Sequence, residues 1–482
     1  MKLVLIHPPA KTVVEQKDIP NYQHIGLGYL ASYLEKFGVD VKVIDAKLER
    51  LSLDDVIEMT LHEDPDVIGL TAMTHEIDRA NETAVSIRNR INEALFVIGG
   101  VHVTALPRET LTAYNVFDVG IIGEGELTLQ KLVDMLVQRK RDFSAIDGIV
   151  YRKGTGIMLN KEQSWIQDLD SLPFPAWHHF PKATVYRIIT SRGCPFPCVF
   201  CMRASGKTQR VRSPENVVSE IEHVIKVEKP EKFMFSDETF TLNKNHVNRI
   251  CDLLIEKKLH KEIKWGSTTR VDVISFELLD KMKSAGCYEI QFGVESGNEQ
   301  VLRAIRKNIH MDQASKAINL AKEVGLRTEA AFILGHPNET FDTAYDTINF
   351  AAELNPDILQ LGIMVPYPGT EVAKMAERGE GGYKILSNNW SDYNKQLGNA
   401  LELDSLSRVD LEKLQLIGYL KLFIFNRRFL GLLRFIFAYR LEMVSYIKSV
   451  VFQKRKSTRK SEISFYKIIM LIIDRKVKRG LA

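Results

Sequence analysis

The sequence predicts an α/β protein built as a doubly wound parallel sheet, a partial (β/α)6 barrel and a helical, basic C-terminal region. Short apolar, β-branched runs alternate with helical patterns in two stretches of the chain, and a proline-rich segment separates these stretches. After residue 381 the strand signal stops, and residues 411–482 carry 17 Lys and Arg against four acidic residues. Residues 411–482 therefore carry a net charge of +13. Because the whole chain has a net charge of +4, residues 1–410 carry −9.

Length and composition exclude several classes of protein. A chain of 482 residues is too long for one core, since a domain usually holds ~100–200 residues. Hydrophobic residues make up 45% and charged residues 26%, which excludes a disordered chain and a polytopic membrane protein. Five cysteines exclude a disulfide scaffold and indicate a reducing, cytoplasmic location. The N-terminus has the features of a first strand and lacks those of a signal peptide.

Residues 1–145 are expected to form the first domain, a doubly wound, Rossmann-like sheet. Its strands are predicted at residues 2–6, 41–44, 67–71, 96–98 and 119–122, with helical patterns at 26–37, 53–62, 76–92 and 127–137. Such a sheet binds its ligand at the carboxyl ends of its strands, where this chain has loops rich in Gly, Thr and His.

The rest of the chain divides into three further parts. Residues 146–184 are expected to form a hairpin and an extended, proline-containing linker. Residues 185–383 are expected to form the partial barrel, with strands at 185–190, 233–235, 264–268, 289–293, 328–334 and 358–364. Residues 384–482 are expected to be helical and to end in a basic amphipathic tail.

Three of the five cysteines, Cys194, Cys198 and Cys201, fall within eight residues directly after the first barrel strand. Buried structural cysteines behave as single small apolar residues, which is the prediction for Cys251 and Cys287. Zinc is the competing metal, but a structural zinc site takes four N or S ligands, and no second Cys/His pair has suitable spacing. Thiolates are the usual ligands of iron–sulfur clusters, and three of them would leave one iron of a [4Fe-4S] cluster open.

This CxxxCxxC loop at the end of a barrel strand resembles that of the radical S-adenosyl-L-methionine (SAM) superfamily. The resemblance implies that SAM chelates the open iron and is cleaved to a 5′-deoxyadenosyl radical, with an electron donor such as flavodoxin or ferredoxin. It also implies contacts to SAM from residues of the cysteine loop and of the barrel strand ends. These are Phe200, Asp237, Glu238, Arg270, Glu295 and Ser296.

In a chain with such a barrel, the glycine-rich loops at 99–104 and 123–128 resemble the B12 (cobalamin)-binding domain of cobalamin-dependent radical SAM enzymes. The implied cobalamin contacts are Thr71, Gly99, Gly100, His102, Thr104, Gly123 and Glu124. The Asp-x-His-x-x-Gly segment, which supplies a histidine ligand to cobalt, is missing after the first strand. The lower face of cobalt is therefore expected to lack a histidine, with His7, His24 and His102 as the remaining candidates.

The resemblance implies a methyltransferase that uses the 5′-deoxyadenosyl radical and methylcobalamin on an unactivated carbon. Radical cyclisation or oxidative rearrangement without methyl transfer is one alternative, and a non-catalytic corrinoid or cluster sensor is another. The sequence identifies no catalytic acid or base, and it leaves the substrate open as a small molecule or a lipid.

The basic tail allows two interpretations. Aromatic and aliphatic residues interleaved with Arg and Lys are typical of helices that lie on a membrane surface, here the inner face of the membrane. The same pattern also fits helices packed on the barrel. Nucleic-acid binding is not expected, because no binding motif accompanies the charges.

Overall fold

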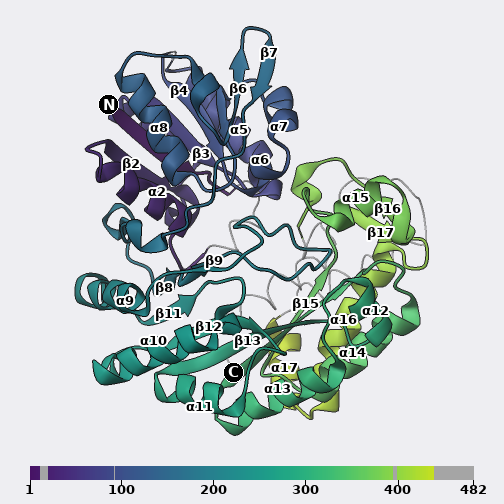
Figure 1. Ribbon diagram of the computed structural model, residues 1–482. Coiled ribbons are helices and arrows are strands. Elements are labelled where there is room, and N and C mark those ends of the chain that lie inside the picture. Colours follow the sequence, from purple (N-terminus) through teal and green to yellow (C-terminus); the bar gives the residue numbers. More distant parts are fainter. Residues whose placement is uncertain (11–19, 92, 395–398, 439–482) are drawn as a thin grey trace.

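The computed structural model describes residues 1–10, 20–91, 93–394 and 399–438, and it shows two α/β bodies, one above the other in Figure 1. The upper body is the first sheet with its helices. The lower body is the barrel, and the segments around β9 lie between the two (Figure 1).

The first sheet has seven strands in the order β2-β1-β3-β4-β5-β6-β7, and β1 to β5 are parallel. Their bounds are β1 Lys2–His7, β2 Asp40–Asp45, β3 Val67–Thr71, β4 Leu95–Gly99, β5 Val119–Ile121, β6 Ile149–Lys153 and β7 Gly156–Leu159. The hairpin β6–β7 pairs antiparallel with β5, so the hairpin that was predicted ahead of the linker extends this sheet.

Helices cover both faces of the first sheet, and its strands are therefore apolar rather than alternating. Helices α2 (Ile25–Glu35) and α8 (Glu126–Val137) supply the core on one face. Helices α4 (Leu53–Glu63), α5 (Ile77–Arg88), α6 (Val101–Ala105) and α7 (Pro107–Ala113) supply it on the other. The short α3 (Ala46–Glu49) follows β2. This arrangement confirms the doubly wound sheet.

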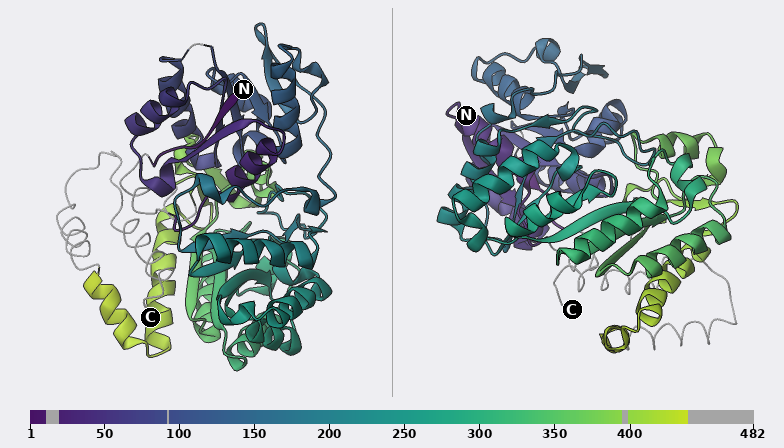
Figure 2. Two further views of the ribbon diagram at one scale, coloured as in Figure 1. Left: turned by 90° about the vertical axis from the view of Figure 1, so that its left-hand side faces the viewer. Right: turned by 60° about the horizontal axis from the view of Figure 1, so that its bottom comes forward.

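The second sheet has six parallel strands in the order β15-β14-β13-β12-β11-β8, which confirms the partial barrel. Its strands are β8 Val185–Ile188, β11 Lys232–Phe235, β12 Trp265–Arg270, β13 Cys287–Glu295, β14 Arg327–Leu334 and β15 Ile358–Ile363. The helices between them are α9 Pro214–Glu228, α10 Lys244–Glu256, α11 Phe276–Ser284, α12 Glu299–Ala304, α13 Met311–Glu323 and α14 Phe341–Leu354, and they follow the outside of the sheet (Figure 2). One continuous apolar core joins strands and helices and includes the buried rings of Phe235, Phe240 and Trp265.

The C-terminal region contains one departure from the expected helices. After α15 (Glu371–Glu377), the strands β16 (Tyr383–Ile385) and β17 (Leu401–Leu403) pair antiparallel. Three-residue strands are too short to give a periodic signal in the sequence.

Two helices follow this hairpin, and the first settles part of the question about the tail. Helix α16 (Arg408–Phe425) packs on α14 and β15, and a Cβ atom at Gly418 would lie 2.5 Å from Leu361. Residues 408–425 are therefore part of the barrel's packing. Helix α17 (Phe429–Ala438) follows. The basic cluster at 454–460 and the apolar run at 465–473 lie outside the described residues. Within the described residues, no helix combines the length and the apolar character that crossing a membrane requires.

Candidate active site

The cysteine loop lies between two short antiparallel strands, β9 (Ser191–Arg192) and β10 (Arg210–Val211). The chain turns at Gly193, whose φ is 92°, and a Cβ atom there would lie 2.2 Å from the carbonyl oxygen of Thr208. Only glycine fits this turn. The backbone N–H of Cys194 donates to the carbonyl of Gly206, which closes the base of the loop.

The three cysteines of this loop are free thiols with unequal burial: Cys198 is buried, Cys194 is partly buried and Cys201 is exposed. Burial raises the pKa of the Cys198 thiol, so a thiolate at this position needs positive charge beside it. Three adjacent thiols on one polar loop fit three corners of an iron–sulfur cluster. Cys251 and Cys287 are buried in the barrel core, as predicted.

Asp237 anchors the start of this loop. Its carboxylate accepts hydrogen bonds from the backbone N–H groups of Thr190 (2.7 Å) and Ser191 (2.9 Å) and from the Thr190 hydroxyl (2.5 Å). Burial raises the pKa of Asp237 to about 6. Both carboxylate oxygens are engaged by the protein, so in this structure Asp237 positions the loop. The neighbouring Glu238 lines the glycine-rich pocket described below.

Arg270, at the end of β12, brings positive charge to the cluster loop. Its Nη1 lies 3.9 Å from the Sγ of Cys198, and its guanidinium lies 3.7 Å above the ring of Phe196. An ion pair with Asp272 (2.8 Å) and a hydrogen bond to the carbonyl of Lys307 hold it there. This placement fits a thiolate at Cys198 and was not foreseen, because the sequence suggested a contact to SAM.

The end of β13 is a strained, buried corner. Glu295 has a φ of 73°, and the strand register shifts between Gly293 and Glu295. The Glu295 carboxylate accepts from Lys307 Nζ at 2.9 Å, and its carbonyl accepts from His336 Nε2 at 3.2 Å. A non-glycine residue in the left-handed region marks a functional site when the surroundings hold it there.

Two further predicted SAM contacts lie near this corner. The Ser296 hydroxyl is fully buried and lies 3.0 Å from the Thr347 hydroxyl, which makes Ser296 part of the packing. Phe200 is partly buried, and its ring centroid lies 6.2 Å from that of His336. Sequence reasoning singled out neither Lys307 nor His336, although His336 lies in the strand-end segment 332–340, which resembles the fifth strand of the family's barrel.

A large pocket opens at the carboxyl ends of β3, β4 and β5, with an empty volume of about 1300 Å³ that includes its open mouth. Six of the seven predicted cobalamin contacts line it, together with Ser191, Arg192, Ser236 and Glu238 from the part of the chain that follows the linker. The six predicted residues are Thr71, Gly99, Gly100, Thr104, Gly123 and Glu124. The pocket therefore lies between the glycine-rich loops and the root of the cysteine loop.

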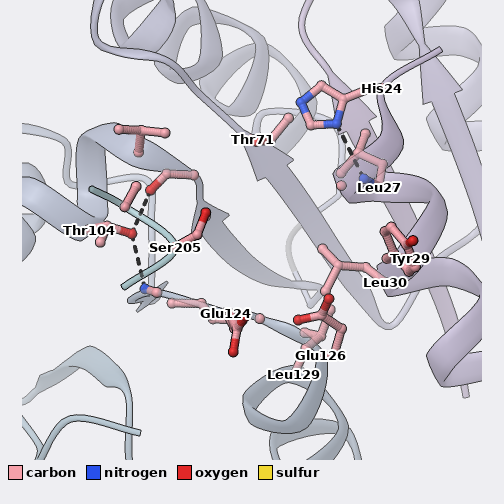
Figure 3. Close-up of a pocket in the computed structure, with 18 of the residues that line it drawn as sticks. His24, Leu27, Tyr29, Leu30, Thr71, Thr104, Glu124, Glu126, Leu129 and Ser205 are labelled. Atoms are coloured by element: carbon pink, nitrogen blue, oxygen red, sulfur yellow. Dashed lines mark hydrogen bonds between the residues drawn. The ribbon is translucent and has the colours of Figure 1, made fainter. Parts of the chain in front are cut away.

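Glycines shape the wall of this pocket. Gly100 has a φ of 101°, and a Cβ atom there would lie 2.6 Å from the carbonyl of Ala72. The Thr104 hydroxyl accepts from the N–H of Gly123 and donates to the carbonyl of Gly100, which ties the two glycine-rich loops together (Figure 3). A wall without side chains lets a large planar ligand and its nucleotide tail approach the backbone, so these residues fit cobalamin. His102 lies outside this wall and packs its ring against Trp390 at 5.1 Å.

His24 caps the start of α2, and of the three histidine candidates for cobalt it alone lines the pocket (Figure 3). Its Nδ1 accepts a hydrogen bond from the N–H of Leu27 at 3.2 Å. Burial, with the charge of His7, lowers the pKa of His24 to about 4, so the ring is neutral and carries its proton on Nε2. Neither nitrogen then has a lone pair free for cobalt.

His7 is engaged elsewhere. Its Nδ1 lies 2.7 Å from Asp45. Burial lowers the pKa of His7, but the hydrogen bonds to Asp45 and Glu76 outweigh burial and raise it to about 9. The ring is therefore cationic at neutral pH and offers cobalt no lone pair.

A buried ionic network joins the pocket to the cysteine loop. Glu124 pairs with Arg192 (3.0 Å) and with Arg210 (2.9 Å), and Glu126 pairs with Arg192 (2.7 Å). Glu124 lies in the loop after β5 and Glu126 is the first residue of α8, and the two arginines come from the strands that frame the cysteines. Arg192 directly precedes Gly193 and Cys194, a position in sequence that could have drawn attention to it.

A second cavity, with an empty volume of about 1060 Å³ including its mouth, adjoins the first at Val101. Met73 to His75 of the first body and Phe200 to Met202 of the cysteine loop lie on its wall. Residues at the ends of β14 and β15 complete it. It therefore places empty space beside both Cys201 and the first pocket.

Comparison with known proteins agrees with this geometry. Residues 188–351 match the family model of the radical SAM superfamily, and residues 20–133 match that of the B12 binding domain. PH0819 of Pyrococcus horikoshii, described as an uncharacterised methyltransferase, is 32% identical over 435 residues, which are 88% of this chain and 93% of the relative. An anaerobic magnesium-protoporphyrin IX monomethyl ester cyclase of Rubrivivax gelatinosus is 29% identical over 446 residues, which are 89% and 78% of the two chains.

A solved structure shows the same fold. OxsB, a cobalamin-dependent SAM radical enzyme with aqua-cobalamin and SAM bound, superposes with a TM-score of 0.72 and 17% identity, over 100% of this chain and 80% of that one. Both family models, a relative that spans most of the chain and the shared architecture lead to one conclusion: this chain is an enzyme of the cobalamin-dependent radical SAM family, whose cofactors are a [4Fe-4S] cluster, SAM and cobalamin.

Proposed function

We propose that the enzyme transfers a methyl group to a carbon atom of an apolar small molecule. One observation carries the proposal: the glycine-lined pocket and the cysteine loop share a wall, formed by Ser191, Arg192, Ser236 and Glu238, and the second cavity adjoins both. When bound, the cluster and SAM supply a carbon-centred radical, and methylcobalamin supplies the methyl group. The relative PH0819 is described as a methyltransferase, which supports this choice.

Different residues of the chain bind the cluster, SAM and cobalamin. Cys194, Cys198 and Cys201 hold the cluster, and Arg270 balances the charge of the Cys198 thiolate. Phe200, Glu238 and Glu295 contact SAM, while Asp237 and Ser296 position the loops on which those contacts depend. Thr71, Gly99, Gly100, Thr104, Gly123 and Glu124 hold cobalamin.

The second cavity supports an apolar substrate. Nine of its fourteen lining residues are Met, Ile, Val, Phe or Pro, and among the described residues that line it there is no Asp, Glu, Lys or Arg. Burying a charged substrate group there would leave that charge without a partner, which is costly. Thr74, His75 and Tyr367 also line the cavity, so one end of a largely hydrocarbon molecule, such as a lipid, would meet polar side chains there.

Cyclisation is the second candidate function, because the cyclase relative covers 89% of this chain. The two reactions change the substrate mass in opposite directions. The reduced holoenzyme, incubated anaerobically with trideuteromethyl SAM and an apolar metabolite fraction, is expected to give a product that carries one labelled methyl group in the mass spectrum. The Cys198→Ala variant is the matched control and should give none. An unlabelled product that has lost hydrogen would instead establish cyclisation.

Two partners complete the proposal. An electron donor such as flavodoxin or ferredoxin would reduce the cluster. The exposed apolar side chains of α17, Phe429, Leu430 and Leu433, lie on the helix that leads into the basic tail, and they favour peripheral contact with an anionic membrane surface.

A further inference from the structure

Three potential metal ligands meet on the surface, away from both pockets. Glu35 is the last residue of α2. His178 and His179 belong to a 3-10 turn, η4 (Trp177–His179), in the linker that leads into the barrel. The first turns of α2 line the glycine-rich pocket, so Glu35 is at the opposite end of that helix.

The ligand atoms converge on one point. The Nε2 atoms of His178 and His179 lie 3.1 Å and 2.7 Å from the same carboxylate oxygen of Glu35. One ligand atom from each residue falls within 4.8 Å of the other two. In a tetrahedral zinc site with bonds of roughly 2.0–2.2 Å, neighbouring ligand atoms are roughly 3.3 Å apart. The two distances from Glu35 are about 0.2 Å and 0.6 Å shorter than that spacing, so each imidazole would have to move outward by these amounts to admit the ion.

The surroundings also suit a cation that keeps one water ligand. The His178 side chain is 64% exposed, which leaves room for solvent at the remaining coordination position. The carbonyl end of α2 adds partial negative charge, whereas the ammonium of Lys42 opposes a cation.

We propose that Glu35, His178 and His179 form a binding site for a divalent transition metal, with zinc as the ion that best suits two imidazoles and one carboxylate. The site fixes the linker to α2. The linker already follows that helix, since the N–H of Ala176 donates to the carbonyl of Gly28 and Lys36 donates to the carbonyl of Ser171. A bound ion would add a third link between the linker and α2, at the C-terminal end of the helix and just before the chain enters the barrel.

Zinc titration of the loaded holoenzyme tests the proposal. The protein should carry cluster and cobalamin, so that the loop cysteines are occupied, and should be tag-free and treated with chelator. Calorimetry is expected to show one zinc per chain bound at least tenfold more tightly by the wild type than by His178→Ala or Glu35→Gln. Zinc should also raise the melting temperature of the wild type and leave that of both variants unchanged.

His310→Ala is the matched control, because His310 is an exposed histidine that lies 3.3 Å from the carboxylate of Glu299, and among the described residues no second histidine joins this pair as a potential ligand. It should bind zinc as the wild type does. X-ray absorption at the zinc edge is expected to show nitrogen and oxygen neighbours only. Equal zinc affinity in the wild type and His178→Ala, or sulfur neighbours at the zinc, would overturn the site.

Discussion

Gly193 shows how single residues decide whether the cysteine loop can form. A side chain at this position would collide with the carbonyl of Thr208 at 2.2 Å, and the backbone needs a positive φ there. The loop then turns back along β10, and Asp237 holds its root through three hydrogen bonds. The spacing of the cysteines in the sequence is useful for a cluster only because these residues fix the loop.

Replacement of Cys194, Cys198 or Cys201 with Ala is expected to abolish SAM cleavage and to reduce the iron content from about four per chain to nearly none, because a cubane that lacks one thiolate is labile. Iron analysis and methionine formation after anaerobic reconstitution measure both effects. Cys251→Ala and Cys287→Ala are the controls, since both thiols are buried in the barrel core. A cluster that survives in Cys198→Ala would contradict the assignment.

A second prediction concerns His24, because its role as the N-cap of α2 conflicts with a role as a cobalt ligand. We expect the electron paramagnetic resonance spectrum of bound cob(II)alamin to lack nitrogen superhyperfine splitting from the protein. The spectrum should stay the same in His24→Asn, which retains a capping side chain. His24→Ala should lower the free energy of unfolding by about 0.5–2 kcal/mol through the lost cap. Splitting that disappears in His24→Asn would show that His24 binds cobalt.

Among the secondary-structure elements, the contact between the loop after β5 and the pair β9–β10 couples the two halves of the site. Glu124 and Glu126 of the first body meet Arg192 and Arg210 of the second, and their side chains are all at most 11% exposed. Burial raises the pKa of Glu124, but the hydrogen bond from Arg210 and the charge of Arg192 outweigh burial and lower it. The carboxylate is thus ionised, and its contribution to stability is lost as the pH falls through its depressed pKa.

Glu124→Gln is expected to destabilise the protein by about 3–5 kcal/mol, because it leaves two buried arginines without their shared carboxylate. Urea unfolding measures this loss, and a cobalamin titration should show weaker binding because the network lines the pocket. Glu58→Gln is the matched control, since Glu58 pairs with Arg90 at 3.5 Å on the surface. Its removal should change stability by at most about 0.5 kcal/mol. An equal effect of both variants would show that the network has no special role.

The strands can be predicted from the sequence because each is a local pattern: apolar runs between turn signals give β1 to β5 and all six barrel strands. The ion network cannot be predicted in this way, since Glu124 and Arg210 are 86 residues apart and only the packing of the two bodies brings them together. The contacts of Lys307 and His336 with Glu295 could not be predicted for the same reason. The role of Arg270 beside Cys198 likewise depends on how β12 ends relative to the cysteine loop.

Across the whole molecule, the proposed division at residues 145, 184 and 383 stays a prediction, with one adjustment. The hairpin β6–β7 extends the first sheet, so we place it with the first domain and let the linker begin after β7. Sequence patterning identified the hairpin but not its partner strand, because an edge position is set by tertiary contacts. The C-terminal region divides similarly: α16 is packed on the barrel, whereas α17 exposes a row of apolar side chains.

The last prediction concerns α17 and the basic residues after it. Phe429, Leu430 and Leu433 are 56%, 74% and 61% exposed, and residues 439–482 add further Lys and Arg. If this region lies on a membrane, the wild type should co-sediment with vesicles that contain anionic lipid and should dissociate as salt increases. The reason is that each basic residue near the surface contributes only ~1 kcal/mol and is screened beyond ~8–10 Å. The double variant L430D/L433D should lose most of this binding while it keeps its cluster and cobalamin.

The packing of α16 and the exposure of α17 determine which control variant and which deletion are suitable for this vesicle experiment. Val137→Asp replaces an equally exposed apolar residue, 61% exposed at the end of α8, and should bind vesicles as the wild type does. Deletion should begin at residue 439, because a cut at residue 416 would remove Gly418, Tyr419 and Leu422 from the barrel core and would confuse unfolding with lost binding. A wild type that stays in the supernatant with anionic vesicles at low salt would exclude the membrane role, and the basic tail would then have to act on the barrel itself or on a protein partner.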